Sequence, residues 1–312
     1  MISAVVPAFN EEESLEEFYK VLIPNLAKLD KSYEAIFVDD GSSDNTLKIL
    51  QEFEGKNKNV KILSFRQHRG KAEALTSGFQ AAKGDLIVTL DADLQDRPEE
   101  IENLVIKQKE GFDLVTGWRK DRKDSKIFIN LPSKLFNFLS GLFWGLKLND
   151  YNCGLKLYTK DAAKSLNLYG GMQRFIPLLL YQSGFKVTEV PVAHEKRKHG
   201  KSKYGFSKSF KEFPDMFTML FITKYAKHPL RFFGYIGSVA SAIGFIILTY
   251  LFVLHLMGQR VGTRPLLTFG MLLVLAGFQV LFTGFLADLI LHISRKDNQS
   301  INLEEGLKYK TE

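Results

Sequence analysis

Two aspartates separated by one residue, Asp91 and Asp93, stand directly after the apolar segment Ile87–Leu90. Carboxylates at this spacing suit a hard divalent cation, because Mg²⁺ and Mn²⁺ take oxygen ligands and bridge substrate phosphates. A pair of surface aspartates in a turn is the alternative, and it would be preferred if the pair stood alone. The other polar clusters of the chain favour the metal-binding interpretation.

A second acidic cluster, Asp39 and Asp40 followed by Gly41 and Ser42, also comes after an apolar run. A turn followed by a helix cap explains Gly41 and Asp44, but it does not explain two adjacent acids. Carboxylates would repel a phosphate, whereas they accept hydrogen bonds from a nucleobase or a ribose. The cluster is therefore compatible with a nucleotide site.

The segments that contain these residues alternate between strand-like and helix-like patterns. This alternation is typical of an α/β layer fold, whose elements would position the polar clusters. Ser14 and Glu17 have the spacing of a capping box at the start of the first helix. The predicted strands are 2–6, 35–38, 60–65 and 86–90, and the predicted helices begin at Ser14, at Asp44 or Asn45, at Lys71 and at Pro98.

Polar residues gather just after three of these strands, at 10–13, 39–42 and 91–95. In open, mostly parallel sheets, ligands bind at the carboxyl ends of the strands. We therefore expect the three clusters to meet in one crevice.

Four segments, in this order, resemble the family-two glycosyltransferases: VVPAFNEE, VDDGSSDNT, GKAEALTSGFQAAKGD and LDADLQDRPE. More narrowly, they resemble the polyprenyl-phosphate sugar transferases, which include dolichol-phosphate mannose synthases and bacterial undecaprenyl-phosphate glucosyltransferases. The resemblance covers roughly residues 2–205. It implies a GT-A fold, a nucleotide-diphosphate sugar donor, a divalent metal and inversion at the anomeric carbon. His68 departs from the more usual Asn-Phe-Gly-Lys pattern, which Gly70 and Lys71 keep.

The resemblance also assigns roles to matching positions. Asp93, with Gln95 as companion and Asp91 beside it, would hold Mg²⁺ or Mn²⁺, while Asp91 and Ala92 would line the donor. The segment 150–158, DYNCGLKLY, resembles the family's D-x-x-x-G-x-x-x-Y region, in which Asp150 would border the acceptor, either orienting it or acting as a base. The expected nucleotide contacts are Pro7, Ala8, Asn10, Glu11, Asp39, Asp40 and Lys71, and the expected phosphate contacts are Arg119, Arg197 and Lys203.

The composition limits the alternatives for the whole chain. Its 312 residues are enough for one sizeable domain and an additional part, and 42 Lys and Arg against 35 Asp and Glu give a net charge of +7. Cys153 is the only cysteine, so neither an intramolecular disulfide nor a cysteine-based zinc site is expected, which fits a reducing compartment. The first residues lack the basic start and the cleavage site of a signal peptide.

Two segments, 232–257 and 266–287, carry no Asp, Glu, Lys or Arg. The shorter would be about 33 Å long as a helix, enough for a hydrocarbon core of about 30 Å. Buried core helices are the alternative, but two adjacent apolar segments of this length are difficult to bury in a small protein. We therefore predict a transmembrane hairpin.

The charges that flank the two spans predict their orientation. Basic residues outside the spans outnumber those of the connecting loop, so both termini and the catalytic domain should be cytoplasmic in a multi-pass protein of the cell membrane. Glycines of the first span suggest close helix packing, either within the hairpin or in a homo-oligomer. The basic residues outside the spans are Lys224, Lys227, Arg231, Arg295 and Lys296, and those of the connecting loop are Arg260 and Arg264. The glycines of the first span are Gly234, Gly237 and Gly244.

Basic residues concentrate at 119–126 and 194–211. A solvated charged face is one explanation, and no nucleic-acid motif accompanies these segments, so we expect no nucleic acid. The second segment precedes an aromatic stripe that begins at Phe206, which predicts an amphipathic helix at the bilayer surface beside a lipid phosphate. A second apolar-aromatic helix, 127–146, would lie either in the interface or in the core.

The predicted organisation is a cytoplasmic GT-A domain (1–205), a juxtamembrane amphipathic helix (206–228), a two-span hairpin (229–294) and a cytoplasmic tail (295–312). The expected reaction moves one sugar from a nucleotide sugar, with UDP preferred to GDP, onto a polyprenyl phosphate. A phosphomonoester is already largely dianionic at neutral pH, so a strong base is less necessary and the role of Asp150 stays open.

Two other functions compete with this prediction. A synthase that extends a polysaccharide would share the nucleotide site, but Gln173 and Arg174 are followed by Phe-Ile-Pro and not by the tryptophan of a Q-x-x-R-W motif. A non-enzymatic scaffold or a flippase subunit would need no intact acids at the nucleotide site. Neither the donor sugar nor the pathway can be read from the sequence.

Overall fold

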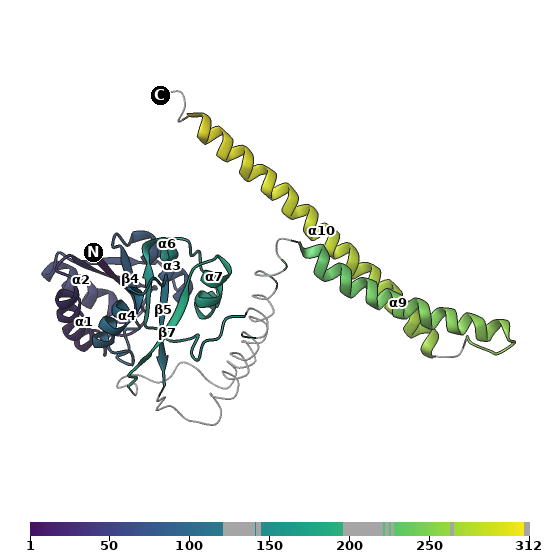
Figure 1. Cartoon of the computed structure of the whole chain (residues 1–312), viewed down its shortest axis with the longest axis horizontal. Coiled ribbons are helices and arrows are strands. Elements are labelled where there is room, and N and C mark those ends of the chain that lie inside the picture. Colours follow the sequence, from purple (N-terminus) through teal and green to yellow (C-terminus); the bar gives the residue numbers. More distant parts are fainter. Residues whose placement is uncertain are drawn as a thin grey trace. The chain divides into compact units, whose positions relative to one another are not determined.

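The computed structural model describes residues 1–120, 141, 145–195, 221, 225, 228–262 and 265–308, with side chains up to 293. The chain forms two compact units, 1–216 and 217–312 (Figure 1). The first unit contains the sheet and the polar clusters, and the second contains the two apolar segments.

The first unit is built on a seven-stranded sheet with the order β3-β2-β1-β4-β6-β5-β7. All neighbouring pairs are parallel except those made by β6, which runs against both β4 and β5. The four strands predicted from the sequence are present and are one to three residues longer or shorter than expected. The strands are β1 Ile2–Ala8, β2 Tyr33–Asp39, β3 Val60–Ser64, β4 Leu86–Thr89, β5 Leu114–Arg119, β6 Lys156–Thr159 and β7 Val187–Val192.

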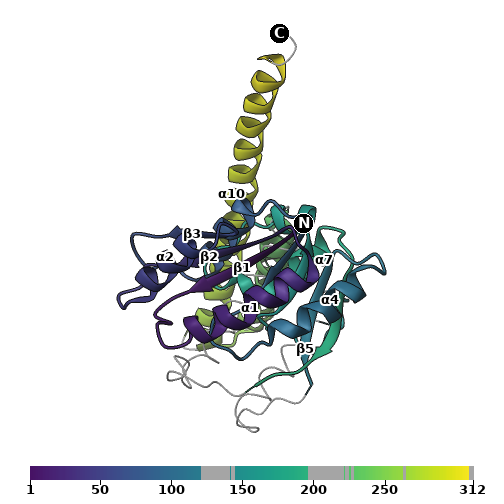
Figure 2. The same ribbon diagram turned by 90° about the vertical axis from the view of Figure 1, so that its left-hand side faces the viewer.

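Helices cover both faces of this sheet. Figure 2 views it from the face that α1, α2 and α4 cover, and α3, α6 and α7 pack on the other face. Two short 3₁₀ helices, η1 Pro98–Glu100 and η2 Met172–Phe175, precede α4 and α7. The α-helices are α1 Leu15–Leu29, α2 Thr46–Lys56, α3 Lys71–Ala81, α4 Ile101–Gln108, α6 Lys160–Lys164 and α7 Ile176–Gln182.

The two cores follow from the alternation of side chains along the buried strands. In β1, Ala4 and Val6 belong to the core under α1, while Val5 between them packs in the core under α3. β2 repeats the pattern, with Phe37 in the first core and Ile36 in the second. Strands that bury both faces read as continuous apolar runs, which is why the sequence revealed them.

The first helix begins where expected, but the reason predicted for it is wrong. Ser14 precedes α1, yet its hydroxyl makes no capping hydrogen bond to the helix and instead donates to the carbonyl oxygen of Glu11 at 3.1 Å. The turn after β1 therefore orients Ser14 backward along the chain, away from the helix.

The second unit is a hairpin of two long helices, α9 Pro229–Leu256 and α10 Pro265–Lys308 (Figure 1). By length and composition, Pro229–Leu256 and Pro265–Ile293 are each able to cross a membrane. Most of their large apolar side chains are exposed in the isolated chain, which is the opposite of the first unit. The predicted hairpin of two apolar helices is confirmed.

Glycines set the contact between α9 and α10. A methyl group added at Gly237 would lie 2.5 Å from the carbonyl oxygen of Gly277, and one added at Gly244 would lie 2.9 Å from that of Gly270. A methyl group at Gly234 would meet only Leu230 of its own helix, at 3.7 Å. Gly237 and Gly244 therefore serve the hairpin itself, whereas Gly234 does not.

Three predicted features lie outside the described residues. These are the amphipathic helix over most of 206–228, the greater part of the helix 127–146, and the basic positions Arg197 and Lys203. The predicted tail, 295–312, overlaps α10, which continues to Lys308.

Candidate active site

All strands except β6 end at the same edge of the sheet, and this edge carries the polar clusters. β1 and β4 are neighbours in the sheet although β2 and β3 separate them in sequence, so the strand order reverses between them. Ligands bind at such a reversal in open α/β sheets. β6 runs in the opposite direction and therefore begins at this edge, so the loop 145–155 that leads into it reaches the same place.

The turn after β1 is fastened to the turn after β2. The backbone N–H of Asn10 donates to Ser42 Oγ at 3.0 Å, and Asn10 Oδ1 accepts from the N–H of Ser43 at 2.8 Å. The N–H of Glu11 donates to Thr46 Oγ1 at 2.9 Å. Asn10 has a φ of 52°, a left-handed conformation that asparagine tolerates better than most residues. These contacts fix the shape of the predicted nucleotide end.

Asp39 is buried beneath the turn after β2 and stabilises that turn through its carboxylate. One carboxylate oxygen accepts from the N–H of Ser42 at 3.2 Å, and the other accepts from Ser64 Oγ at 2.9 Å. Asp39 therefore ties the turn after β2 to the end of β3. Its predicted contact to a nucleotide would have to use the remaining lone pairs of the same two oxygens.

Asp40 organises the loop that precedes α3. Its carboxylate accepts from the backbone N–H groups of Arg69 at 2.8 Å and Gly70 at 2.9 Å. His68 Nδ1 lies 2.9 Å from Asp40 Oδ2, and the imidazole stacks on the ring of Phe9 with centroids 4.1 Å apart. The position that departs from the family pattern thus packs directly against the predicted base-binding acid.

The loop after β4 carries the predicted metal ligands in a strained backbone. Asp93 Oδ1 accepts from the N–H of Gln95 at 3.1 Å, and Leu94 between them has a φ of 61°. That conformation costs a residue with a side chain about 1–2 kcal/mol. Asp91 pairs with Lys71; burial would raise the pKa of Asp91, but Lys71 outweighs it and holds this pKa below its ordinary value.

Gly154 permits two acids to approach the loop before β6. A methyl group at Gly154 would lie 2.5 Å from Asp96 Oδ2 and 2.8 Å from Asp91 Oδ2. The carbonyl oxygen of Gly154 also accepts from Thr89 Oγ1 of β4 at 2.9 Å. Only a residue without a side chain fits here, which explains the glycine of the segment 150–158 in physical terms.

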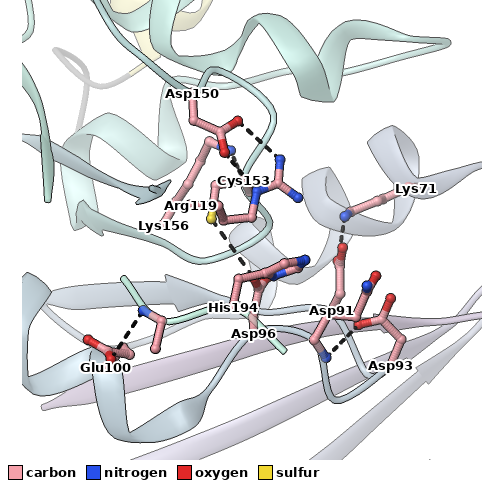
Figure 3. Close-up of polar contacts among 12 residues, drawn as sticks. Lys71, Asp91, Asp93, Asp96, Glu100, Arg119, Asp150, Cys153, Lys156 and His194 are labelled. Atoms are coloured by element: carbon pink, nitrogen blue, oxygen red, sulfur yellow. Dashed lines mark hydrogen bonds and ion pairs between the residues drawn. The ribbon is translucent and has the colours of Figure 1, made fainter. Parts of the chain in front are cut away.

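Asp96 is a buried acid among these groups (Figure 3). Its Oδ1 lies 3.9 Å from His194 Nδ1 and 3.9 Å from the sulfur of Cys153. Burial, reinforced by the nearby charge of Asp91, raises the pKa of Asp96 to about 7. The Cys153 thiol is also buried, and its pKa is raised well above the ordinary value, so the thiol stays protonated.

Arg119 and Asp150 form a buried ion pair at the end of β5. Arg119 donates from Nε to Asp150 Oδ2 at 2.7 Å and from Nη2 to Oδ1 at 3.0 Å (Figure 3). Burial alone would lower the pKa of Arg119, but the bonds to Asp150 outweigh it and raise this pKa. Two parallel bonds of this kind fix orientation as well as charge.

Lys156 places a second buried cation behind the loop. It is the first residue of β6, lies between Thr89 of β4 and Thr116 of β5, and donates from Nζ to the carbonyl oxygen of Cys153. Burial lowers the pKa of Lys156. Its charge favours the ionised form of Asp91, and its hydrogen bond supports the segment that contains Gly154.

The structure gathers most of the predicted site residues at the edge where the parallel strands end. Pro7 and Ala8 are the last residues of β1, Arg119 is the last of β5, and Ala92 is buried between the two metal-site aspartates. The residues brought to this edge are Pro7, Ala8, Asn10, Glu11, Asp39, Asp40, Lys71, Asp91, Ala92, Asp93, Gln95, Arg119 and Asp150. Arg197 and Lys203 lie outside the described residues.

The predicted metal ligands have the right chemistry but are few. Within the part of the chain that the structure describes, no group of three or more histidine, cysteine or acidic side chains is arranged to hold a metal ion. The atoms of Asp91, Asp93 and Gln95 that could ligate a metal ion are all oxygens. Such a set fits Mg²⁺ or Mn²⁺, which keep several waters and bind substrate phosphates as further ligands.

Sequence reasoning missed four residues of this site, namely Asp96, Cys153, Lys156 and His194. Asp96, Cys153 and Lys156 stood inside segments already singled out, so their positions were known but their burial was not. His194 begins the basic segment 194–211, but it follows the end of β7, a strand that the sequence pattern did not reveal, so its place at this site was not predicted. Had β7 been predicted, His194 would have been expected at this edge, because it stands just after the end of that strand.

Fold and site together define a glycosyltransferase of the GT-A type. The Glycosyl transferase family 2 profile matches residues 3–166. The chain belongs to this family, and the family predicted from the four sequence segments is confirmed.

Relatives are similar over nearly the whole chain. Dodecaprenyl-phosphate galacturonate synthase of Rhizobium johnstonii is 36% identical over 306 residues, covering 96% of this chain and 90% of the relative. Undecaprenyl-phosphate 4-deoxy-4-formamido-L-arabinose transferase of Proteus mirabilis is 35% identical over 292 residues, covering 93% and 88%. Both names state a polyprenyl phosphate, in agreement with the narrower resemblance.

A solved structure supports the fold. Glucosyl-3-phosphoglycerate synthase of Mycobacterium tuberculosis, crystallised with Mn²⁺ and UDP-glucose, superposes with a TM-score of 0.53 at 21% identity. The match covers 70% of this chain and 78% of that protein. At this identity the similarity establishes the GT-A architecture alone.

Proposed function

We propose that this protein transfers one sugar from a nucleotide-diphosphate sugar to a polyprenyl phosphate, with inversion at the anomeric carbon. The observation that supports this most strongly is the similarity to polyprenyl-phosphate transferases over more than nine-tenths of the chain. The hairpin of α9 and α10 agrees with a lipid acceptor, because it would hold the enzyme where that acceptor lies.

For the donor we propose a UDP-sugar, in agreement with the bacterial relatives and the solved neighbour that holds UDP-glucose. Pro7, Ala8, Asn10 and Glu11 would surround the nucleotide at the end of β1. Asp39 and Asp40 would accept hydrogen bonds from its base and ribose. The relatives act on sugars other than glucose, so a galacturonate or a formamido-arabinose donor belongs in any test.

The acidic loop would serve the diphosphate. Asp93, Gln95 and Asp91 would hold Mg²⁺ or Mn²⁺, which when bound neutralises phosphate charge and stabilises the leaving nucleotide. Lys71, at the first position of α3, adds a cation beside Asp91 and is therefore suited to contact the donor phosphates. This arrangement would put positive charge where the departing nucleotide gains negative charge.

The acceptor brings its own nucleophile. A lipid phosphate is largely dianionic at neutral pH, so one of its oxygens can attack the anomeric carbon without a strong base. Arg119, Arg197 and Lys203 would hold that phosphate, with Asp150 at the border of the acceptor site. The roles of these four residues are part of the proposal.

We further propose that residues 1–205 form the cytoplasmic catalytic domain, 206–228 an interfacial helix, 229–294 the membrane hairpin and 295–312 a cytoplasmic tail. The excess of basic residues outside the two spans supports this orientation. Labelling of single cysteines introduced near Gln259, in the connection between α9 and α10, with a membrane-impermeant reagent would test it, because this segment would face the opposite side of the membrane.

The decisive experiment incubates purified protein with Mg²⁺ or Mn²⁺, undecaprenyl phosphate and a panel of UDP- and GDP-sugars, and detects nucleotide release and lipid product by mass spectrometry. We expect one donor to give a lipid-phosphate monosaccharide, and Asp93→Ala to abolish it. Glu102→Ala, an exposed acid in α4, is the matched control.

Two results would contradict the proposal. Nucleotide release that depends on an oligosaccharide, with no lipid product, would indicate a polysaccharide synthase. Absence of turnover with every donor would indicate a non-enzymatic scaffold.

A further inference from the structure

The contact between Arg119 and Asp150 separates two roles that the sequence could not distinguish. Asp150 accepts from Arg119 Nε at 2.7 Å and from Nη2 at 3.0 Å, so both of its oxygens are engaged. Asp150 Oδ1 also accepts from the backbone N–H of Asn152 at 3.1 Å. The side chain of Asp150 is only 3% exposed, whereas that of Arg119 is 15% exposed.

Asp150 is not required to fasten its own loop, because other groups do so. The backbone N–H of Asn149 donates to Glu189 Oε2 at 2.8 Å, and that of Asp150 donates to the same oxygen at 3.3 Å. Tyr151 donates from its hydroxyl to the carbonyl oxygen of Leu146 at 2.5 Å. The loop is thus attached to β7 by its backbone, and the two side-chain bonds that the Asp150 carboxylate accepts from Arg119 are available to hold the guanidinium.

The geometry is also unfavourable for a base. A general base must reach the proton that it removes within hydrogen-bond distance, directly or through a water molecule. Asp150 is the more buried partner of its pair, and Arg119 covers both of its oxygens. The exposed part of the pair is the guanidinium, whose Nη1 donates to no acceptor among the residues that the structure describes.

We propose that Asp150 is a positioning residue that holds the Arg119 guanidinium in place for the acceptor phosphate, and that it takes no proton in the reaction. This inference rests on the proposed function and assigns roles within that site. A guanidinium fixed by two parallel bonds keeps its orientation while its other edge receives a phosphate oxygen. Without Asp150, Arg119 would have to be ordered again in each catalytic cycle.

A double-mutant cycle tests this directly. Asp150→Asn and Arg119→Gln should each lower kcat/KM for the lipid phosphate about 100-fold, a loss typical of a misplaced phosphate-binding group. The double variant should be no worse than the poorer single variant, because Asp150 acts only through Arg119. A further loss of tenfold or more in the double variant would show an independent role for Asp150 and overturn the proposal.

The pH dependence supplies a readout that a structural defect alone would not change. A base contributes a limb on the acid side of the kcat/KM profile, and its removal abolishes that limb. We expect the profile of Asp150→Asn to keep the wild-type shape at a lower height. Loss of the acid limb would assign Asp150 as the base.

Folding is controlled with a matched variant. Glu34 is also buried and ion-paired, with Lys61 at 2.6 Å, but it lies at the start of β2, the end of the strand opposite the site. Glu34→Gln should keep the KM for both substrates. If Asp150→Asn fails to fold, as judged by UDP binding, Arg119→Lys replaces it, since that variant keeps the charge but loses the paired bonds. A rise in acceptor KM with an unchanged pH profile supports the proposal, and unchanged kinetics contradict it.

The proposed function and this inference can fail separately. A wild-type protein that makes no lipid product contradicts the proposed function. The same cycle can then be measured on the affinity of the wild-type, single-variant and double-variant proteins for undecaprenyl phosphate. Additive losses there would overturn the positioning role, and non-additive losses would retain it.

Discussion

Two regions of the site are held together by different forces. The nucleotide-side region, residues 9–12, 39–46 and 64–70, is fixed mainly by hydrogen bonds that backbone N–H groups and hydroxyls donate to the side chains of Asn10, Asp39 and Asp40. The N–H of Asn10 adds a bond to Ser42 Oγ. The acidic region, residues 91–96, 119 and 150–156, is fixed by contacts between charged side chains, of which Lys71–Asp91 and Arg119–Asp150 are the closest.

This difference matches what each region is proposed to bind. In the nucleotide-side region, neutral backbone and hydroxyl donors fix the shape of a pocket for a base and a ribose, and the carboxylates of Asp39 and Asp40 serve as hydrogen-bond acceptors. Buried charges are costly to desolvate unless they are paired, and they interact strongly with any charge that arrives. The acidic region is therefore suited to a diphosphate, a cation and a phosphate acceptor, and it should be the more sensitive of the two to substitution.

Among the substitutions that compare the two regions, Gly154→Ala should have the largest effect. The new methyl group would lie 2.5 Å from Asp96 Oδ2 and 2.8 Å from Asp91 Oδ2, so at least one acid must move. We expect kcat/KM to fall about 100-fold or more, because displacement of about 1 Å is enough for such a loss. Nucleotide release measures it, and Gly55→Ala, with no atom within 4 Å, is the control. A change of less than threefold would mean that the acids are not fixed by this loop.

Lys71→Met should have the next largest effect, because this side chain extends from the first residue of α3 and pairs with Asp91 in the acidic region. We expect kcat/KM for the nucleotide sugar to fall about 10- to 100-fold through loss of a phosphate-binding charge. Lys48→Met, an exposed position in α2, is the control for the loss of one charge. Equal losses in the two variants would remove Lys71 from the donor site.

Asp40→Asn tests the nucleotide-side region and should be milder. An amide keeps one acceptor oxygen and replaces the other with an NH₂ group, so the Gly70 N–H loses its shorter bond to Oδ2, at 2.9 Å, and keeps at most the longer one to Oδ1, at 3.2 Å. That corresponds to about 1 kcal/mol, and we expect the donor KM to rise about 3- to 10-fold with little change in kcat. Asp161→Asn, exposed in α6, is the control. A loss as large as that of Gly154→Ala would remove the contrast between the regions.

Glu34→Gln should alter stability and leave the kinetics unchanged. Burial would raise the pKa of Glu34, but Lys61 and Ser3 outweigh it and lower this pKa below 4.5. A lowered carboxyl pKa stabilises the fold at pH values above the unfolded pKa, and this contribution is lost as the pH falls through the folded value. We expect a deficit of about 1–2 kcal/mol at pH 7 that shrinks below about pH 4. Tryptophan fluorescence during thermal unfolding measures it; a deficit independent of pH would assign the effect to packing.

Much of the fold could be predicted because its signals are local. β1, β2 and β4 bury both faces and read as apolar runs, and the polar residues that follow them are adjacent in sequence. The two spans could be predicted because their segments contain no charged residues. β6, four residues long, and β7, which is only partly buried, gave no such signal and were not predicted.

The sequence by itself determined which residue types stand at the ends of the strands, the family, and the two apolar helices. Tertiary structure alone decided that β6 runs backward, that Gly154 lies against Asp91 and Asp96, and that Arg119 holds Asp150 from 31 positions away. The physical reason is that strand order brings distant residues together, and a local pattern of apolar residues fixes each strand but not its neighbours.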